Sequence, residues 1–134
     1  MNKNVVALVE AARQALGRRL IRPLLDNEGQ LPVLLLDPAL EEEILVTLSP
    51  EIRQGERLLA DKAAPAIPLV RRLADSVRQL IGAASAAALP VLLVPSPARY
   101  HVKRWLEPVF PRLAVVAAGE IPPEIRLRPV GTVR

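Results

Sequence analysis

The sequence predicts an α/β domain: a small mixed sheet of about four strands with helices packed on it, preceded by one helix. Two aliphatic segments, residues 31–36 and 89–94, are short, continuous and bounded by turn residues, as strands buried on both faces are. Each segment is followed by a polar residue, a proline and a helical pattern. Two such strand–turn–helix units, separated by a long helical segment, favour a parallel crossover connection.

The composition is that of one globular domain with an aliphatic core. Of the 134 residues, 51% are apolar and 24% are charged, whereas only 2% are aromatic. The net charge of +4 permits weak attraction to nucleic acid, acidic lipid or acidic protein without choosing among them. The chain has no cysteine, which excludes disulfides and thiolate metal sites. No apolar stretch reaches the roughly 20 residues of a membrane-spanning helix, and no signal peptide is recognised, so no membrane span is expected.

Residues 5–20 have the spacing of an amphipathic helix, which Asn4 caps and Pro23 ends. Its polar face carries Arg13, Gln14 and Arg18. Its apolar face is formed by Val5, Leu8, Val9, Ala12, Leu16 and Leu20.

The dipeptide Asp37-Pro38 predicts the start of a second helix, because aspartate is favoured at the N-cap and proline at the first helical position. Glu41, Glu42 and Glu43 follow in the early turns, where the helix dipole favours negative charge. The predicted buried stripe is Leu40, Ile44 and Leu48.

The middle of the chain is interrupted by turn residues, and a short helix is predicted only over residues 56–62. After Pro68 a regular helix is predicted, with Asp75 able to pair with an arginine at helical spacing. Its apolar face consists of Leu69, Val70, Leu73, Val77, Leu80 and Ile81.

Three further elements are predicted at the C-terminal end. Ser96 is the expected cap of a helix that buries Ala98, Val102, Trp105, Leu106 and Val109. Residues 113–118 form a third apolar strand. Residues 125–128 alternate strictly, as in a strand with one solvent-facing side. Pro129 cannot donate a ladder hydrogen bond, so this last strand is expected at an edge of the sheet.

No catalytic, metal or cofactor site is expected. Consecutive glutamates on a helix point about 100° apart, so Glu41 to Glu43 do not converge on one ion. Ser96, His101 and Asp37 are the only conceivable hydrolase triad, but the sequence lacks the G-x-S-x-G elbow. The glycines show no nucleotide-binding spacing either. A small hydrolase is therefore the weakest of the alternatives, to be tested by a Ser96→Ala variant on ester substrates.

The ordered set of motifs resembles the C-terminal part of the flagellar and injectisome type III export-gate proteins. Residues 12–18 resemble that family's arginine-rich helix before its last subdomain, and residues 36–41 its LDPALE turn. Residues 90–94 are similar to the next strand. Residues 115–116 with the EIPPEI segment at 120–125 and the final VGTV are similar to the terminal strand pair. A tyrosine that is common before the EIPP turn is replaced here by Ala117-Ala118-Gly119.

The resemblance implies a non-enzymatic component of protein export. Residues 1–25 would be a helix from the neighbouring subdomain, and residues 26–134 the C-terminal α/β subdomain. It also implies a cytoplasmic location in a homo-oligomeric ring, with other ring subunits, export chaperones, substrates and components of the ATPase complex as partners. The membrane region of the full-length family is not in this chain.

Predicted exposure, rather than the resemblance, selects the candidate partner-binding residues. These are Tyr100, Lys103 and Arg104 on the helix after Pro97, and Arg126 and Arg128 on the edge strand. No nucleic acid is expected as a partner. The alternative is a free-standing basic adaptor that binds nucleic acid or acidic protein, for which salt-dependent oligonucleotide binding through Lys103 and Arg104 would be the evidence.

Overall fold

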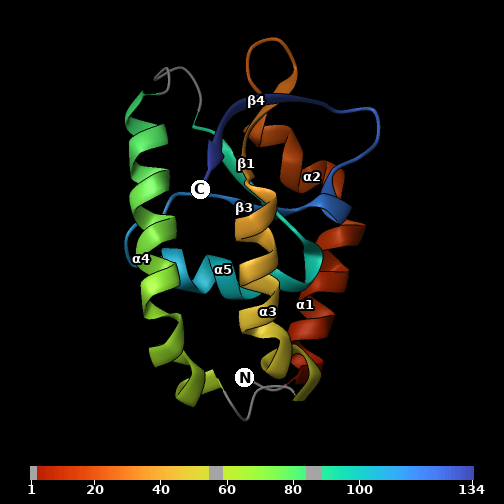
Figure 1. The fold of residues 1–134 in the computed structure, drawn as a ribbon. Coiled ribbons are helices and arrows are strands. Elements are labelled where there is room, and N and C mark those ends of the chain that lie inside the picture. Colours follow the sequence, from red (N-terminus) through yellow and green to blue (C-terminus); the bar gives the residue numbers. More distant parts are fainter. Residues whose placement is uncertain (1–2, 55–58, 84–88) are drawn as a thin grey trace.

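The structure is a computed structural model that describes residues 3–54, 59–83 and 89–134, with side chains described over residues 5–48, 67–82 and 89–134. Helices and strands alternate along it (Figure 1). In chain order they are α1 (Lys3–Ala15), α2 (Gly17–Ile21), η1 (Arg22–Leu24), β1 (Gln30–Leu36), α3 (Pro38–Gln54), α4 (Leu59–Ala83), β2 (Val91–Val94), η3 (Ser96–Ala98), α5 (Arg99–Leu106), β3 (Val115–Ala117), η4 (Ala118–Glu120) and β4 (Arg126–Val133).

The four strands form one sheet in the order β3-β2-β1-β4. All three neighbouring pairs are parallel, so the α/β class and the four strands are confirmed, whereas a mixed sheet was wrong. The physical reason lies in the last connection. Ile121 and Ile125, between β3 and β4, pack on the core that lies on the α2 side of the sheet. The chain therefore crosses this face and enters β4 from the same end as the other strands.

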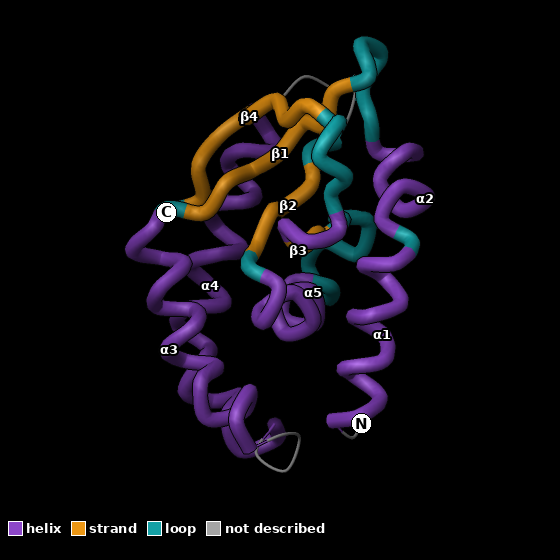
Figure 2. The backbone as a smooth tube through the Cα atoms, turned by 90° about the vertical axis from the view of Figure 1, so that its right-hand side faces the viewer, coloured by secondary structure: helices purple, strands orange, loops and turns teal. Residues whose placement is uncertain are grey.

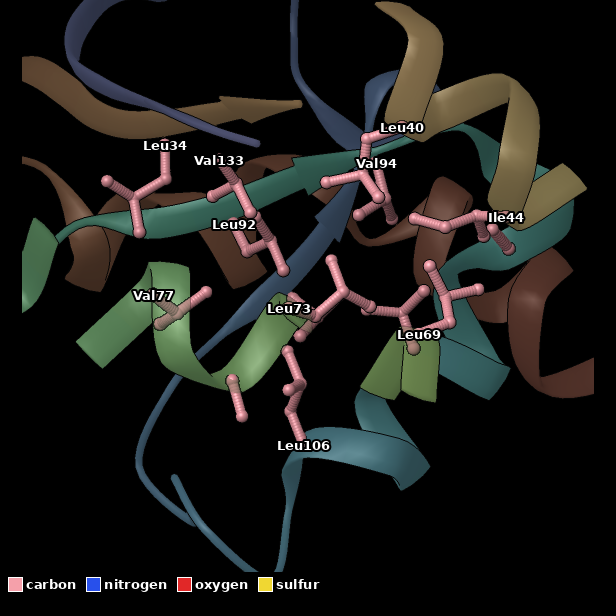
Figure 3. Close-up of a cluster of buried hydrophobic side chains, with 14 of the residues drawn as sticks. Leu34, Leu40, Ile44, Leu69, Leu73, Val77, Leu92, Val94, Leu106 and Val133 are labelled. Carbon is pink, nitrogen blue, oxygen red and sulfur yellow. The ribbon is translucent and has the colours of Figure 1, made fainter. Parts of the chain in front are cut away.

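Both faces of the sheet are covered, which gives three layers (Figure 2). The larger core lies between the sheet and helices α3, α4 and α5, and Figure 3 shows Leu34 and Leu92 from the strands beside Leu73 and Leu106 from the helices. On the opposite face, Ile21 of α2 packs against Leu31, Val33, Val91 and Val116.

The first strand–turn–helix unit forms as predicted. Leu31, Val33 and Leu34 of β1 are fully buried on alternating faces, which confirms a strand covered on both sides. Asp37 caps α3, because its Oδ2 atom accepts a hydrogen bond of 3.1 Å from the N–H of Ala39. The apolar stripe of α3 begins with Leu40 and lies in the larger core.

The second unit differs in its cap. Ser96 does not cap α5: the chain passes through the short 3-10 helix η3, whose N-cap is Pro95, and no side chain makes a capping hydrogen bond there. A proline at this point fixes the backbone without needing a serine oxygen. Helix α5 ends at Leu106, so Val109 lies beyond it and is 43% exposed rather than buried.

Helix α4 spans Leu59–Ala83 and runs through Pro65 and Pro68, whereas the sequence predicts that turn residues interrupt this segment. Burial of Leu69, Leu73 and Val77 in the larger core confirms the predicted apolar face and offsets the hydrogen bonds that proline cannot make. The predicted short helix at 56–62 begins outside the described residues, and its remainder is the start of α4.

Strand β4 is an edge strand, as predicted, but it is longer than the alternating segment. It continues past Pro129 because the register against β1 shifts between Val33 and Leu34, where Pro129 pairs with Val33 and Gly131 with Leu34. An irregularity of this kind is where a sheet tolerates proline. The predicted alternation of buried and exposed side chains is wrong, because Arg126, Leu127 and Arg128 are all exposed.

The N-terminal amphipathic segment is two helices, because the backbone at Leu16 (φ −100°, ψ 15°) separates α1 from α2. An amphipathic helix on a globular protein normally turns its apolar face to the core. Here Leu8, Val9 and Leu16 are 70%, 41% and 47% exposed. Helix α1 is therefore attached to the domain by its other face.

Candidate interaction surfaces

The described residues were predicted to hold no metal-binding cluster. Within the described ranges, no group of three or more histidine, cysteine, aspartate or glutamate side chains is placed to hold a metal ion. Glu41, Glu42 and Glu43 follow one another along α3, and Glu43 is engaged by Arg72 at 2.9 Å. None of the helices in the described part of the chain has the length and apolar character needed to span a bilayer.

Tyr100, Lys103 and Arg104 all lie on α5, where they form a small polar surface. The hydroxyl of Tyr100 accepts a hydrogen bond of 3.0 Å from Nη1 of Arg104, whose guanidinium lies 5.8 Å from the centre of the tyrosine ring. Lys103 is directed inward, because its Nζ donates to the carbonyl oxygen of Leu113 at 2.9 Å. Tyr100 and Arg104 are therefore better placed than Lys103 to meet a partner.

Arg126 and Arg128 lie on β4, at the opposite edge of the sheet from β3, to which Arg99 of α5 is hydrogen-bonded. Both residues are exposed. Nε of Arg128 donates to Oδ2 of Asp26 at 2.9 Å, whereas Arg126 has no side-chain partner in the described part of the chain. The five candidate residues thus form two separate surfaces rather than one site.

His101 follows Tyr100 on α5, and their rings meet edge to face with centroids 5.3 Å apart. Burial lowers the pKa of His101, and the nearby positive charge of Arg104 lowers it further, against the opposing effect of Glu10. The imidazole is therefore neutral at pH 7.

The first of two ion pairs that hold α1 on the domain joins Glu10 to Arg99 of α5. Nε and Nη2 of Arg99 donate to Oε1 and Oε2 of Glu10 at 2.8 and 3.1 Å. Nη1 of the same guanidinium donates to the carbonyl oxygen of Val115 in β3 at 3.2 Å. Only 8% of the Arg99 side chain is exposed, so this planar, two-pronged contact is well shielded from water.

The second ion pair joins Arg13, one turn along α1, to Glu120 of η4. Nε of Arg13 is 2.5 Å from Oε2 of Glu120 without the angle of a hydrogen bond, and Nη2 is 3.5 Å from Oε1. Oε1 of Glu120 also accepts the N–H of Ala117 at 2.8 Å. Since 1% of the Glu120 side chain is exposed, Arg13 supplies the charge that its burial requires.

Close backbone contact continues this attachment into α2. A Cβ atom on Gly17 would lie 2.2 Å from the carbonyl oxygen of Glu120, so no larger residue fits there. Arg18 next to it forms an ion pair with Glu124.

We call the four residues of the two ion pairs, Glu10, Arg13, Arg99 and Glu120, the ionic clamp. Sequence reasoning placed Arg13 on the polar face of its helix but could not identify its partner, which lies 107 positions away.

A groove of about 360 Å³ lies beside the clamp, between the α1–α2 junction and the turn that follows η4. Leu16, Arg18 and Arg19 line one side of it. The other side includes Ile121, Pro122 and Pro123 of the EIPP turn. The groove therefore combines apolar residues with Gln14, Glu120 and two arginines.

The described residues define an α/β domain whose distinctive features are two shielded ion pairs and a groove beside them. Residues 1–126 match the FHIPEP family. The protein hrpC2 of Xanthomonas euvesicatoria is 31% identical over 134 residues, which is 98% of this chain and 19% of that protein. The chain belongs to the FHIPEP family, the family of the type III export-gate proteins.

Solved structures support the same assignment. The Chlamydia pneumoniae CdsV protein has a TM-score of 0.69 and 27% identity over 96% of this chain and 35% of that one. CdsV in its complex with CdsO has a TM-score of 0.74 and 29% identity, and the match covers 96% of this chain and 36% of that one. The Shigella flexneri MxiA protein shares the fold, with a TM-score of 0.75 at 24% identity, over 98% and 38%. The chain thus spans well under half the length of each of these relatives.

Proposed function

We propose that this chain is the C-terminal cytoplasmic part of a type III export gate, where it supports ring assembly and the docking of export substrates and chaperones without catalysing a reaction. The observation that carries the proposal is the 31% identity to hrpC2 over nearly the whole chain, together with the shared fold of CdsV. One related structure is a nonameric SctV-C and another is a complex of CdsV with CdsO. Both kinds of contact, subunit to subunit and with a component of the ATPase complex, are proposed for this chain.

In this proposal residues 1–25 belong to the neighbouring subdomain and residues 26–134 form the C-terminal subdomain. The packing of Ile21 on the sheet and the ionic clamp make residues 10–21 the joint between the two. A joint of shielded ion pairs would keep the two parts in a fixed orientation, which assembly of a regular ring requires.

The contact surfaces we assign to this function are those of Tyr100, Lys103 and Arg104 and of Arg126 and Arg128. Arg104 presents an exposed guanidinium stacked on Tyr100, an arrangement that suits a carboxylate on a partner. Arg126 stands on the sheet edge without an ion pair in the described part of the chain. Because Lys103 is bonded to Leu113, we expect it to orient the surface more than to contact the partner.

The experiment uses charge reversals in the protein with its ring-forming partners. Arg104→Glu and Arg126→Glu are each compared with the control Arg112→Glu, an exposed arginine outside both surfaces. Ring formation is followed by mass photometry, and binding of a CdsO-type protein or an export chaperone by calorimetry. We expect at least one reversal to weaken assembly or binding tenfold or more, with the control unchanged. Wild-type behaviour of both reversals in every assay would refute the assigned surfaces.

A further inference from the structure

Strand β3 forms one edge of the sheet, and its outward backbone groups are those to which an added strand would bind. In the parallel ladder with β2, the N–H of Leu92 donates to the carbonyl oxygen of Ala114 at 2.9 Å, and Leu92 pairs with Val115. Successive residues of a strand direct their backbone groups to alternate sides of it. Leu113, Val115 and Ala117 therefore direct theirs away from the sheet.

Side chains of the same domain already occupy these outward groups. Nζ of Lys103 donates to the carbonyl oxygen of Leu113 at 2.9 Å, and Nη1 of Arg99 donates to that of Val115 at 3.2 Å. The third outward residue of β3 donates its N–H to Oε1 of Glu120 at 2.8 Å. All three residues of β3 are buried. Charged side chains that cover an edge strand in this way prevent it from pairing with another chain.

Strand β4, at the opposite edge, is protected by its own sequence. The N–H of Asp37 donates to the carbonyl oxygen of Val133, so every second residue of β1 counted back from Asp37, including Val33, faces β4. Pro129 pairs with Val33 and therefore directs its own backbone to the open side, where a proline offers no N–H. The register shift that follows interrupts this edge further.

Helix α4 closes the far end of the β4 edge. The N–H of Arg134 donates to Oγ of Ser76 at 3.1 Å. The side chain of Leu80 lies so close to Gly131 that a Cβ atom there would be 2.6 Å from it. The exposed stretch before this contact, residues 126–129, is short and ends in the proline.

We propose that Arg99, Lys103 and Glu120 at β3 and Pro129 at β4 are edge-blocking residues, which keep the sheet from being extended by a strand of a second copy. If both edges were open, β3 of one copy could pair with β4 of the next, and such head-to-tail contacts can continue without closing. The inference does not require the proposed function. Under that function, copies stand close together in a ring, where open edges would join them in the wrong arrangement.

One consequence concerns the surface of Arg126 and Arg128, and it does rest on the proposed function. A partner contacts the side chains of this surface and does not add a strand to the backbone of β4. Charge reversal at Arg126 tests the surface, whereas the variants below test the edges. Either idea can therefore fail without the other.

The experiment opens each edge separately in the whole 134-residue chain. A double variant, Arg99→Met with Lys103→Met, frees the carbonyl oxygens of β3 and keeps long side chains over them. Its control is Glu10→Ala, which breaks the same ion pair but leaves Arg99 bonded to β3. Self-association is measured by sedimentation velocity over a range of concentrations, and folding is checked by circular dichroism. If the double variant does not fold, Lys103→Met alone replaces it.

The other edge is opened by Pro129→Val, which restores an N–H to the outward side of β4. Pro111→Val makes the same change in an exposed turn outside the sheet and is the matched control. Hydrogen exchange followed by mass spectrometry reports whether residues 126–130 become protected as the protein associates.

We expect each opened edge to raise the self-association constant about tenfold or more, with both controls at the wild-type value. In Pro129→Val, protection of residues 126–130 should rise with protein concentration. Wild-type association in both opened variants overturns the proposal. Equal association of Glu10→Ala and the β3 variant also overturns it, because the cause would then be lost stability. So does a wild type in which residues 126–130 become protected as its concentration rises, since β4 would then already pair.

Discussion

Glu10 and Arg99, which are 89 positions apart in sequence, meet through two parallel hydrogen bonds that join the first helix to α5. Arg99 also reaches the carbonyl oxygen of Val115 in β3, so one guanidinium connects a helix, a second helix and the sheet. With Arg13 and Glu120 it forms a clamp of two pairs. The consequence is that α1 is held on the domain through Glu10 and Arg13, while Leu8 is left 70% exposed.

Removal of Arg99 should destabilise the fold. Arg99→Ala leaves Glu10 and the carbonyl of Val115 without their donor in a shielded site, and we expect a loss of about 3 kcal/mol in the free energy of unfolding. The exposed pair of Arg78 and Asp75 supplies the control, because Arg78→Ala should cost less than about 1 kcal/mol. Urea denaturation measures both, and equal losses in the two variants would contradict the assigned burial of the clamp.

Gly17 and Gly82 give a matched pair of helical glycine substitutions. Gly17→Ala should destabilise the protein by about 1–3 kcal/mol or more, because its new methyl group meets the Glu120 carbonyl oxygen. Gly82→Ala, with nothing within 4 Å of the new atom, should stabilise by about 0.5–1 kcal/mol through helix propensity. Thermal unfolding of the two variants checks the opposite signs. A stabilising Gly17→Ala would show that α2 and η4 are not in contact.

Asp26 should make stability depend on pH at the acid end. Hydrogen bonds from the N–H of Gln30, foremost, and then from Arg128 and the N–H of Glu28 lower the pKa of this carboxyl. A carboxyl whose pKa is lower in the folded state stabilises above its unfolded pKa, near 3.9, and that stability is lost as pH falls through the folded pKa. The Asp26→Asn variant should therefore lose part of the acid dependence of stability that the wild type shows between pH 5 and 2. An NMR titration with an Asp26 pKa at or above 3.9 would contradict this.

The protonation of His101 should affect the stability of the fold closer to neutral pH. Its pKa is lower in the folded protein, so the unfolded chain binds a proton more readily near pH 6. The stability associated with His101 is present above pH 6.5 and declines as pH falls below it. NMR titration should show a pKa below 6.5 that rises in Arg104→Ala, since one neighbouring positive charge is removed. No change in the pKa of His101 in that variant would exclude Arg104 as a cause.

Local chemistry made part of this fold predictable. Asp37-Pro38 determines a cap within three residues, and the aliphatic run of β1 has the period and length of a strand covered on both faces. The edge position of β4 follows from Pro129 alone. Such features depend only on residues that are close together in the sequence, so they can be predicted from the sequence alone.

The rest depended on contacts between distant segments. The pattern of Leu8 and Leu16 identifies an amphipathic helix but does not say which side docks, and here Arg99 and Glu120 decide it. The parallel entry of β4 is set by a loop that crosses the sheet. The candidate residue Lys103 was placed on the exposed side of α5, yet the carbonyl of Leu113 draws its ammonium inward. A helical period contains no information about such a partner.

The most direct test of the ionic clamp is a double-mutant cycle on Glu10 and Arg99. The free energies of unfolding of wild type, Glu10→Ala, Arg99→Ala and the double variant are measured by urea denaturation. If the two side chains form a direct, shielded pair, we expect a coupling energy of about 1–3 kcal/mol. The double variant should then lose less stability than the two single variants lose in total. Additive losses, with a coupling below about 0.3 kcal/mol, would show that α1 is not held by this contact.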